Sequence, residues 1–576
     1  MATFELEKLP LTYTHSLSDS SSAYQPFPSH SHYQKYYHYN LVITDKDQFR
    51  NFLLVSLTII LAIIALVLIL HFLPHKNKHQ GTSINFKLAI NHALTFYDAQ
   101  KSGHYPKNSP VKFRGDSGLG DGKSADTDLV GGFYDSGNNI KFTFTTAYTT
   151  TLLSWSVMEY HSKYADLGEL QHVRDIIRWG SDYLLKVFIL PTSTSKSNLT
   201  IYSQVGNTIS DKGEPKNDIS CWQRPEDMDY ARPVSICDSS ASDLGGEIVA
   251  ALSASSMVLK NDTEYSKKLV KAAETLHKLV TSEDPKKQGT YTMVDACGKQ
   301  ARDFYKSSSY KDELAWGGTW LFLATGNLTY LDYATETFKS AKSNESDFDN
   351  GAFDWNNKLN AVAVLLTRIR YFRDPGGLYE HALRLSSNST HSLMCSLLFN
   401  DFSRTPGGLI IMKDDNGPLL EYAATASFLS KLYSDYLHHL KFSGAKCKSN
   451  VFSVAMLREF ASSQVNYILG QNPLKMSYLV GYGDKFPVHV HHRSASIPWD
   501  DKKHYSCDGG KKWLNSKDPN LQVLVGAMVG GPDMHDGFID QRNNSRFTEP
   551  NIASNAGLVA ALIALSDNSS GLKDSF

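Results

Sequence analysis

An uncharged apolar segment near the N-terminus limits the possible folds of this chain more than any other feature. From Phe52 to Leu70 no residue is charged, and the only polar side chains are Ser56 and Thr58. Roughly 20 residues of helix span the hydrocarbon core of a bilayer. A buried core helix rarely lacks charge over this length, and a cleaved signal peptide would lie closer to the start of the chain. The sequence therefore predicts a single transmembrane helix over residues 52–73.

The orientation of this predicted helix follows from the features that come after it. Three basic residues flank it closely on each side, so the positive-inside rule does not decide. All six cysteines and all seven Asn-x-Ser/Thr sequons come after the helix. This is typical of a lumenal or extracellular domain, where disulfides and N-glycans form, and it predicts a single-pass type II protein of the plasma membrane or endomembranes (Golgi or endosome). The predicted N-glycosylation sites are Asn198, Asn261, Asn327, Asn344, Asn388, Asn543 and Asn568.

The rest of the chain is predicted to comprise a tail, a stalk and one large domain. Residues 1–51 are rich in Ser, Tyr and His and lack a sustained apolar period, so we expect a disordered cytosolic tail. Residues 74–84 form a polar stalk. No Pro/Ser-rich linker follows the stalk, and residues 85–567 are therefore predicted to form one domain, followed by a C-terminal tail (568–576). The cysteines allow several disulfide pairings, and their spacing does not choose among them.

The large domain is predicted to be all-α. Two stretches repeat their apolar residues at helical spacing, and loops containing Gly and Pro, such as 404–408 and 530–533, lie between such stretches. The apolar fraction of 41% is sufficient for a sizeable core, and the net charge of −1 excludes nucleic-acid binding by bulk attraction. The two apolar stripes consist of Leu269, Ala272, Ala273, Leu276 and Val280, and of Phe428, Leu429, Leu432, Tyr433, Tyr436 and Leu437.

The predicted loops concentrate acidic residues, aromatic residues and a few bases. Cleavage of a glycosidic bond needs such groups, because one carboxylic acid protonates the leaving oxygen and a second carboxylate activates water or attacks directly. Aromatic rings provide platforms for the apolar faces of sugars. No Cys-x-x-Cys or His-Glu-x-x-His metal signature is present in the sequence, and Gly131-Gly132 lacks the spacing of a phosphate-binding loop. The sequence therefore predicts a glycosidase without a metal or another cofactor.

Short motifs in a fixed order extend through this domain. They are RGDS (114–117), DLVGGFYD (128–135), CWQRPEDMD (221–229), DELAWG (312–317), HHRSASIP (491–498), GPD (531–533), DQR (540–542), TEP (548–550) and NAGLV (555–559). Together they resemble glycoside hydrolase family 9, and most closely its membrane-anchored plant branch, the KORRIGAN-type endoglucanases. The resemblance covers residues from about 86 to 566. It implies an (α/α)6 barrel with the active cleft at one end and hydrolysis with inversion at the anomeric carbon.

The resemblance also assigns roles to individual residues. Glu549 matches the general acid of the family, and Asp540 matches its acidic partner nine residues earlier. His491 and Arg493 match a basic pair that contacts the substrate, and His491 is expected to belong to the catalytic group. Further expected substrate contacts are His492 of the same motif and three candidate stacking residues, Trp222, Trp316 and Trp355.

The chain departs from the family pattern at the position of the general base. Where the family has Asp-Ala-Gly-Asp, this chain has Asp135-Ser136-Gly137-Asn138. An amide is not a useful base near neutral pH, so Asn138 cannot take the role of the second aspartate, and Asp135 is the remaining substitute. Loss of a general base typically slows a reaction about 10²–10⁴-fold. Other departures are Ile219 in place of His, Ser545 in place of an aromatic residue, Asn551 in place of a small residue and Lys511 in place of Trp.

Two functions remain open at this point. The first is an endo-1,4-β-glucanase, weakened by Asn138, that hydrolyses internal bonds of cell-wall β-1,4-glucan. The second is a catalytically inactive scaffold of the same fold that binds glucan or a protein partner. In both cases the predicted partners are β-1,4-glucan, the membrane through one helix and, by family resemblance, the machinery of cell-wall synthesis, but not nucleic acid.

Overall fold

The chain divides into two units, residues 1–83 and residues 84–576, which are described separately. The computed structural model describes residues 46–72, 85–191, 199–208, 216–281, 284, 287–344, 352–373, 376–399, 402–413 and 417–566.

The first unit contains helix α1 (Lys46–Phe72), which begins before the predicted membrane segment at residue 52. Among the residues whose side chains the structure describes, no helix has both the length and the apolar character needed to cross a membrane. The predicted stalk (74–84), the predicted C-terminal tail (568–576) and most of the predicted N-terminal tail lie outside the described residues.

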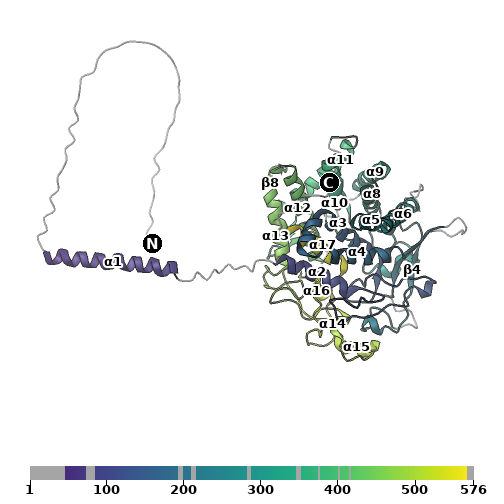
Figure 1. The fold of residues 1–576 in the computed structure, drawn as a ribbon, viewed down its shortest axis with the longest axis horizontal. Helices are drawn as coiled ribbons and strands as arrows, with labels where there is room; N and C mark the ends of the chain where they lie inside the picture. The colour runs from purple at the N-terminus through teal and green to yellow at the C-terminus, as the bar shows by residue number, and fades with distance from the viewer. Residues whose placement is uncertain are drawn as a thin grey trace, which may run out of the picture. The chain divides into compact units, whose positions relative to one another are not determined.

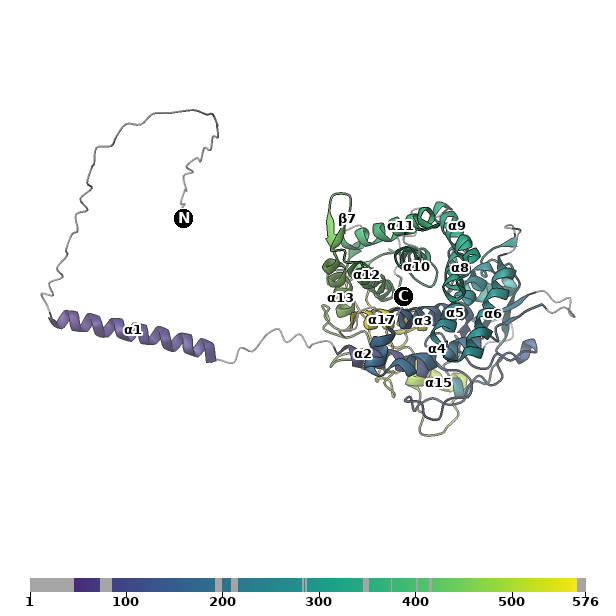
Figure 2. The same ribbon diagram turned by 45° about the horizontal axis from the view of Figure 1, so that its top comes forward.

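Six helices of the second unit pack side by side in a closed ring, which is visible in Figure 2. Each helix contacts the next, and the last contacts the first. In chain order they are α3 (Thr143–Leu167), α5 (Ser242–Val258), α8 (Lys311–Thr325), α10 (Leu359–Phe372), α12 (Leu419–His439) and α17 (Ile552–Leu565).

A second set of helices packs outside this ring (Figures 1 and 2). They are α2 (Phe86–Gln100), α4 (Leu170–Leu184), α6 (Thr263–Val280), α9 (Leu328–Asn344), α11 (Glu380–Leu398) and α13 (Val454–Ile468). Outer and inner helices alternate along the chain, so each outer helix returns the chain and all inner helices run in the same direction. This is an (α/α)6 barrel, and the predicted helical fold is confirmed.

Burial explains which helices are inner and which are outer. Outer helix α6 buries one face, which includes Leu269, Leu276 and Val280 of the predicted stripe, and exposes charged residues on the other. Inner helix α12 is buried almost all round, and every residue of its predicted stripe is buried. Several buried hydroxyls on inner helices bond to their own helix, as Thr150 Oγ1 does by donating to the Thr146 carbonyl at 2.7 Å. This back-bonding lets polar residues occupy fully buried helices.

Two glycines allow the closest approach between inner helices. A Cβ on Gly246 of α5 would lie 2.6 Å from the Glu313 carbonyl oxygen, and a Cβ on Gly317 of α8 would lie 2.7 Å from the Gly246 carbonyl oxygen. Because both distances are too short for a side chain, glycine is required for α5 and α8 to pack at this separation.

Short antiparallel strands supplement the helices, although the sequence analysis predicted none. In one sheet β3 (Thr200–Val205) pairs with β1 (Lys141–Phe142), β2 (Phe188–Ile189) and β4 (Val234–Cys237). Its register includes Lys141 opposite Val205, and β1 leads directly into α3. Two hairpins pair β5 (Ser403–Arg404) with β6 (Ile410–Ile411) and β7 (Gly444–Lys446) with β8 (Val451–Ser453).

Long loops with short helices cover the end of the barrel at which the inner helices begin. These short helices are α7 (Asp295–Gly298), α14 (Arg493–Ser496), α15 (Cys507–Leu514), α16 (Ser545–Thr548) and the 3-10 turns η1 (Lys123–Ala125), η2 (Pro225–Asp227) and η4 (Lys299–Ala301). All six cysteines form disulfides, a pairing that the sequence had left open: Cys221–Cys507, Cys237–Cys297 and Cys395–Cys447.

Candidate active site

Asp135 and Glu549 lie in one site at the N-terminal ends of two neighbouring inner helices. Asp135 precedes β1 and α3, and Glu549 lies three residues before α17. The backbone N–H of Ile552, the first residue of α17, donates to the Asp135 carbonyl oxygen at 2.9 Å. The partial positive charge at a helix N-terminus favours negative charge nearby. The structure therefore brings together two residues that are more than 400 positions apart in the sequence.

Glu549 is held by the loop of residues 135–138. Its Oε1 accepts hydrogen bonds from Ser136 Oγ at 2.9 Å and from the Gly137 N–H at 3.1 Å, and the Asn138 amide nitrogen lies 3.5 Å from the same oxygen. The side chain is partly exposed. A carboxyl group that is fixed through one oxygen at a partly exposed position can present the other oxygen to a substrate.

Asp135 is almost fully buried, with 1% of its surface exposed. The Thr145 hydroxyl donates to Oδ1 and the Tyr305 hydroxyl donates to Oδ2, both at 2.5 Å. Burial raises the pKa of Asp135 to about 7; the two hydroxyl donors lower it in part, and the charge of Glu549 adds to the increase. A carboxyl group with this pKa exchanges its proton near neutral pH, as a general base must.

Asn138 lies beside these two carboxyl groups, but its side-chain amide forms hydrogen bonds within its own loop. Its Nδ2 donates to Ser136 Oγ at 2.6 Å, and its Oδ1 accepts from the Ile140 N–H at 2.9 Å. The resulting chain of donors runs from Asn138 through Ser136 to Glu549. A carboxylate at this position could accept a proton, whereas the nitrogen of this amide only donates a hydrogen bond.

The loop of residues 135–138 packs directly against the 491–493 motif. A Cβ on Gly137 would lie 1.7 Å from the His491 carbonyl oxygen, so only glycine permits this contact. His491 Nδ1 donates to the Arg542 carbonyl at 2.6 Å. Burial lowers the pKa of His491. In the neutral ring Nδ1 carries the proton, and Nε2 is therefore the acceptor.

Asp540 supports the same motif from a neighbouring loop. Its carboxylate accepts the backbone N–H groups of Val488 and His489, each at 3.0 Å, and its Oδ2 lies 3.3 Å from His489 Nδ1. These contacts hold the segment that leads to His491. The geometry gives Asp540 a positioning role, and the predicted catalytic role stays a prediction.

The Arg493 guanidinium is engaged by backbone carbonyls within the protein, and its predicted contact with the substrate stays a prediction. Nε donates to the Cys221 carbonyl at 2.9 Å, Nη1 to the Gly137 carbonyl at 2.8 Å and Nη2 to the Asp218 carbonyl at 2.7 Å. Only 2% of the residue is exposed. A guanidinium with donors in a fixed fork is well suited to this task, and Arg493 clamps three loops together.

Trp222 and His492 are also buried, and the predicted substrate contacts of both stay predictions. The Trp222 ring lies 4.6 Å below the Arg493 guanidinium, and its Nε1 donates to Ser496 Oγ at 2.9 Å. The His492 Nε2 donates to Gln100 Oε1 at 2.9 Å, and its Nδ1 accepts the Ala495 N–H as the N-cap of α14. Both ring nitrogens of His492 are therefore engaged within the protein.

The other two predicted stacking residues differ from each other. Trp316 is 0% exposed and packs edge-to-face with Trp155 and Trp320 in the barrel core, so it is not a sugar platform. Trp355 is partly buried, and its ring lies 4.9 Å from the ring of Tyr305, which holds Asp135. Trp355 therefore remains a candidate for substrate stacking.

The departures from the family motif have separate structural consequences. Ile219 is 40% exposed and presents an apolar surface where a histidine was expected. Asn551 is the N-cap of α17, because its Oδ1 accepts the Ser554 N–H at 2.7 Å. Ser545 begins α16, and Lys511 forms an exposed ion pair within α15. Of these, Ile219 is the change that alters an exposed side chain from polar to apolar.

Most of the predicted N-glycosylation sites that the structure describes are accessible. The exposed asparagines are Asn261, Asn327, Asn388 and Asn543. Asn344 lies in α9, whereas Asn198 and Asn568 lie outside the described residues.

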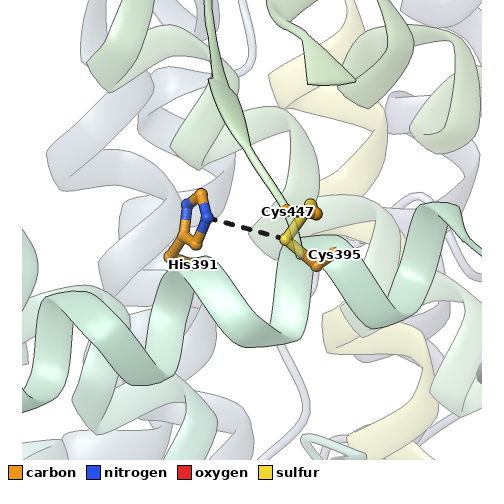
Figure 3. A group of neighbouring side chains, drawn as sticks. All are labelled: His391, Cys395 and Cys447. Atoms are coloured by element: carbon orange, nitrogen blue, oxygen red, sulfur yellow. Dashed lines mark hydrogen bonds between the residues drawn. A yellow bond between two sulfur atoms is a disulfide. The ribbon is translucent and has the colours of Figure 1, made fainter. Parts of the chain in front are cut away.

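His391, Cys395 and Cys447 are a cluster of residue types that can bind metals, as Figure 3 shows. The two sulfurs are joined in a disulfide, so neither is a thiolate ligand. His391 Nε2 lies 2.9 Å from the Lys446 carbonyl and 3.6 Å from Cys395 Sγ. The histidine thus supports the link between α11 and β7.

The sequence analysis missed the residues that hold the two carboxyl groups. Thr145 and Tyr305 hold Asp135, and Ser136 and Gly137 hold Glu549. Tyr305 lies 170 positions after Asp135 and belongs to no recognised motif. Ser136 had a visible signal, because it replaces the alanine of the family pattern next to the altered base.

Comparison with known proteins shows the family of this chain. Residues 86–562 match the model of glycosyl hydrolase family 9. Endoglucanase 25 of Arabidopsis thaliana is 48% identical over 510 residues, which are 87% of this chain and 80% of that protein. Endoglucanase 10 of Oryza sativa subsp. japonica is 46% identical over 510 residues, again 87% of this chain and 80% of that protein.

Solved structures show the same architecture. The endoglucanase of the termite Nasutitermes takasagoensis superposes with a TM-score of 0.69 at 33% identity, over 84% of this chain and 99% of that one. Cellulase Cel9M of C. cellulolyticum in complex with cellobiose gives a TM-score of 0.66 at 29% identity, over 84% and 98%. The match covers the barrel and the loops that carry Asp135 and Glu549, and on this basis the chain belongs to glycosyl hydrolase family 9.

Proposed function

We propose that the protein is a membrane-anchored endo-1,4-β-glucanase whose turnover is weakened by Asn138. The observation that carries this proposal is the pairing of a partly exposed Glu549 with a buried Asp135 at the end of a family 9 barrel where the inner helices begin. The proposed substrate is internal β-1,4-glucosidic bonds of cell-wall glucan. The names of the plant relatives and the cellobiose bound to Cel9M support this substrate class.

In the proposed inverting reaction, Glu549 protonates the leaving oxygen while water attacks the opposite face of the sugar. Asp135 accepts the proton of that water, and its pKa of about 7 suits this role. However, each oxygen of Asp135 already accepts a hydrogen bond, one from the Thr145 hydroxyl and one from the Tyr305 hydroxyl. The attacking water must therefore share one of these oxygens with a hydroxyl donor. Because no second carboxylate stands at position 138, we expect a rate about 10²–10⁴-fold below that of a member with both aspartates.

We also propose that α1 anchors the protein in a membrane. The run from residue 52 to residue 70 is uncharged, and the described apolar side chains from Phe52 to Leu61 are each more than half exposed, so this helix needs apolar surroundings. A type II orientation at the plasma membrane or in endomembranes is supported by the three disulfides and the exposed sequons. Family resemblance supports an association with the machinery of cell-wall synthesis.

A glucan- or partner-binding scaffold is the second candidate function. It is favoured by the amide at Asn138 and by the inward positions of Arg493 and Trp222, which remove expected catalytic and substrate contacts. A scaffold would bind cello-oligosaccharides without releasing reducing ends. Binding and hydrolysis must therefore be measured on the same preparation.

Glu549→Gln tests the hydrolytic proposal. We expect reducing-sugar release from carboxymethyl cellulose to fall at least 10²-fold, because glutamine has no proton to give to the leaving oxygen. Glu264→Gln on the exposed face of α6 is the matched control and should keep the wild-type rate. Hydrolysis by Glu549→Gln at the wild-type rate would remove this residue from the acid role, and an inactive wild type that binds cellohexaose would favour the scaffold.

A further inference from the structure

A cavity of about 750 Å³ lies at the end of the barrel opposite to Asp135 and Glu549. It is lined by the C-terminal parts of three consecutive inner helices, α3, α5 and α8, and by residues of the outer helices α4 and α6. Because the inner helices run in the same direction, their C-terminal ends lie away from the catalytic loops. Cavities of this size accommodate small organic ligands.

One wall of this cavity is apolar. It is formed by side chains from four helices: Val157 and Met158 of α3, Val258 of α5, Val270 of α6 and Leu323 of α8. An inorganic ion alone would leave this wall and most of the volume unfilled. The occupant that fits is a molecule with an apolar body.

A second feature of the cavity is its positive charge. Arg174, Lys260 and Arg373 supply this charge, and His161 lines the cavity as an uncharged ring. Burial lowers the pKa of His161, and the charges of Arg174 and Lys260 lower it further, which shows that these groups lie close enough to interact. The one acidic residue in the lining, Glu159, is neutralised by Arg368 at 3.0 Å.

Arg174 carries a specific signal for a ligand. One of its terminal nitrogens, Nη2, donates to His161 Nε2 at 3.2 Å. Its Nε is buried and has no hydrogen-bond partner among the described residues. A buried donor without a partner is costly, and an acceptor on a bound molecule would satisfy it.

We propose that this cavity binds an amphipathic anion, with a phosphate or carboxylate head at Arg174 and a short aliphatic body along the wall of Val157, Val270 and Leu323. The guanidinium and Lys260 neutralise the head, and His161 fixes the orientation of the guanidinium. The site is independent of the proposed hydrolytic function, because it shares no residue with the catalytic loops.

Isothermal titration calorimetry on the full-length protein tests this proposal. The probes are octyl phosphate and octanoate below their critical micelle concentrations. Inorganic phosphate tests the head group alone, and octyltrimethylammonium tests the same tail with a head group of opposite charge. We expect both octyl anions to bind at one site, inorganic phosphate to bind at least tenfold more weakly and the cation not to compete. No saturable binding of either octyl anion, or equal binding of the cation, would overturn the proposal.

Two variants locate the binding. Arg174→Met keeps the aliphatic stem and should weaken octyl phosphate at least tenfold, whereas Arg178→Met, one turn further along α4 and outside the cavity, should not. Val270→Glu places a carboxylate at the partly exposed edge and should abolish binding even if Arg174→Met folds poorly. Unchanged affinity in Val270→Glu, or equal losses in both arginine variants, would contradict the site.

The glycan predicted at Asn261 is the competing occupant, because Asn261 also lines the cavity. The proposal requires that octyl phosphate binds with the same affinity to the glycosylated protein and to Asn261→Gln. Binding that appears only in Asn261→Gln would mean that the sugar fills the cavity, and the proposal would be wrong.

Discussion

At the scale of single residues, the hydroxyl of Ser136 links Asn138 to Glu549 through two hydrogen bonds. Ser136 Oγ accepts from Asn138 Nδ2 at 2.6 Å and donates to Glu549 Oε1 at 2.9 Å. With an aspartate at position 138, two acceptor oxygens would face each other, and the hydroxyl would donate to that aspartate instead. The amide therefore adds a donor toward Glu549, and in the proposed mechanism it also leaves position 138 without a base.

The first prediction follows from this arrangement. Asn138→Asp should raise glucanase activity at least tenfold, which requires a barrier lower by only about 1.4 kcal/mol. The change is nearly isosteric, and the Ile140 N–H would still find an acceptor. The initial rate of reducing-sugar release measures the effect.

The control for this variant is Asn450→Asp, which introduces the same change at an exposed position in the turn between β7 and β8. Ile219→His together with Asn138→Asp should exceed either single change, because the histidine replaces an exposed apolar side chain near the clamp of Arg493. If wild type already equals a member with both aspartates, Asn138 is not limiting. If all variants stay inactive but bind cello-oligosaccharides, the scaffold is the correct function.

A second prediction concerns pH. If Asp135 is the base, activity rises as Asp135 loses its proton, and the midpoint of the acidic limb should lie near pH 7. Tyr305→Phe removes a hydrogen bond that lowers this pKa, so the limb should move to higher pH by about one unit, since a hydrogen bond to a charged group contributes about 1.5 kcal/mol. The pH profile of kcat/KM measures this shift.

Tyr310→Phe at the start of α8 is the control and should leave the profile unchanged. A limb that does not move in Tyr305→Phe, or that moves to lower pH, would show that Asp135 is not the titrating base.

At the scale of helices, the sequence pattern predicted the existence of the elements better than their contacts. The apolar stripes of α6 and α12 are visible as periodicity, because burial of one face requires apolar residues every three or four positions. The separation between α5 and α8 is not visible in this way. It depends on Gly246 and Gly317, which are glycines in helical segments. Their role in packing can be recognised only when the facing helix is known.

The third prediction tests this contact. Gly246→Ala should destabilise the domain by about 1–3 kcal/mol, because its Cβ would lie 2.6 Å from the Glu313 carbonyl and force the helices apart. The midpoint of chemical denaturation, followed by circular dichroism, measures the loss. Gly120→Ala is the control, since its nearest neighbour lies 3.9 Å away, and a loss equal to that of Gly246→Ala would contradict the packing argument.

At the scale of the whole molecule, the features after the apolar run point to an oxidising compartment. The three disulfides involve every cysteine, and four exposed asparagines belong to sequons. Thioredoxin and glutathione keep most cytosolic thiols reduced, so this pairing is expected of a lumenal or extracellular domain.

The fourth prediction concerns this topology. In intact vesicles, residues 85–576 should resist added protease, and endoglycosidase after lysis should increase their mobility on a gel. A combined Asn261→Gln, Asn327→Gln and Asn543→Gln variant should already migrate faster, because exposed sequons in the lumen are glycosylated. Digestion of the domain in unbroken vesicles, with no glycan shift, would contradict the type II orientation.

The sequence by itself determined the helical class and the family, and it predicted the single large domain and the two carboxyl groups that the structure brings together. Periodicity, composition and ordered motifs are properties of the sequence, and they can be read without knowledge of tertiary contacts. The motif resemblance also predicts that Asn138 stands at the position of the general base. These predictions depend on the residue types and their spacing alone.

Only the tertiary structure decided which motif residues are buried and which partners hold them. Arg493, Trp222 and His492 belong to recognised motifs, yet all three are buried, because their polar groups find partners on loops that are distant in the sequence. Tyr305 belongs to no motif, yet it holds Asp135. A buried polar group requires a partner, and the partner is chosen by how the chain brings distant loops together, a relation that no local pattern records.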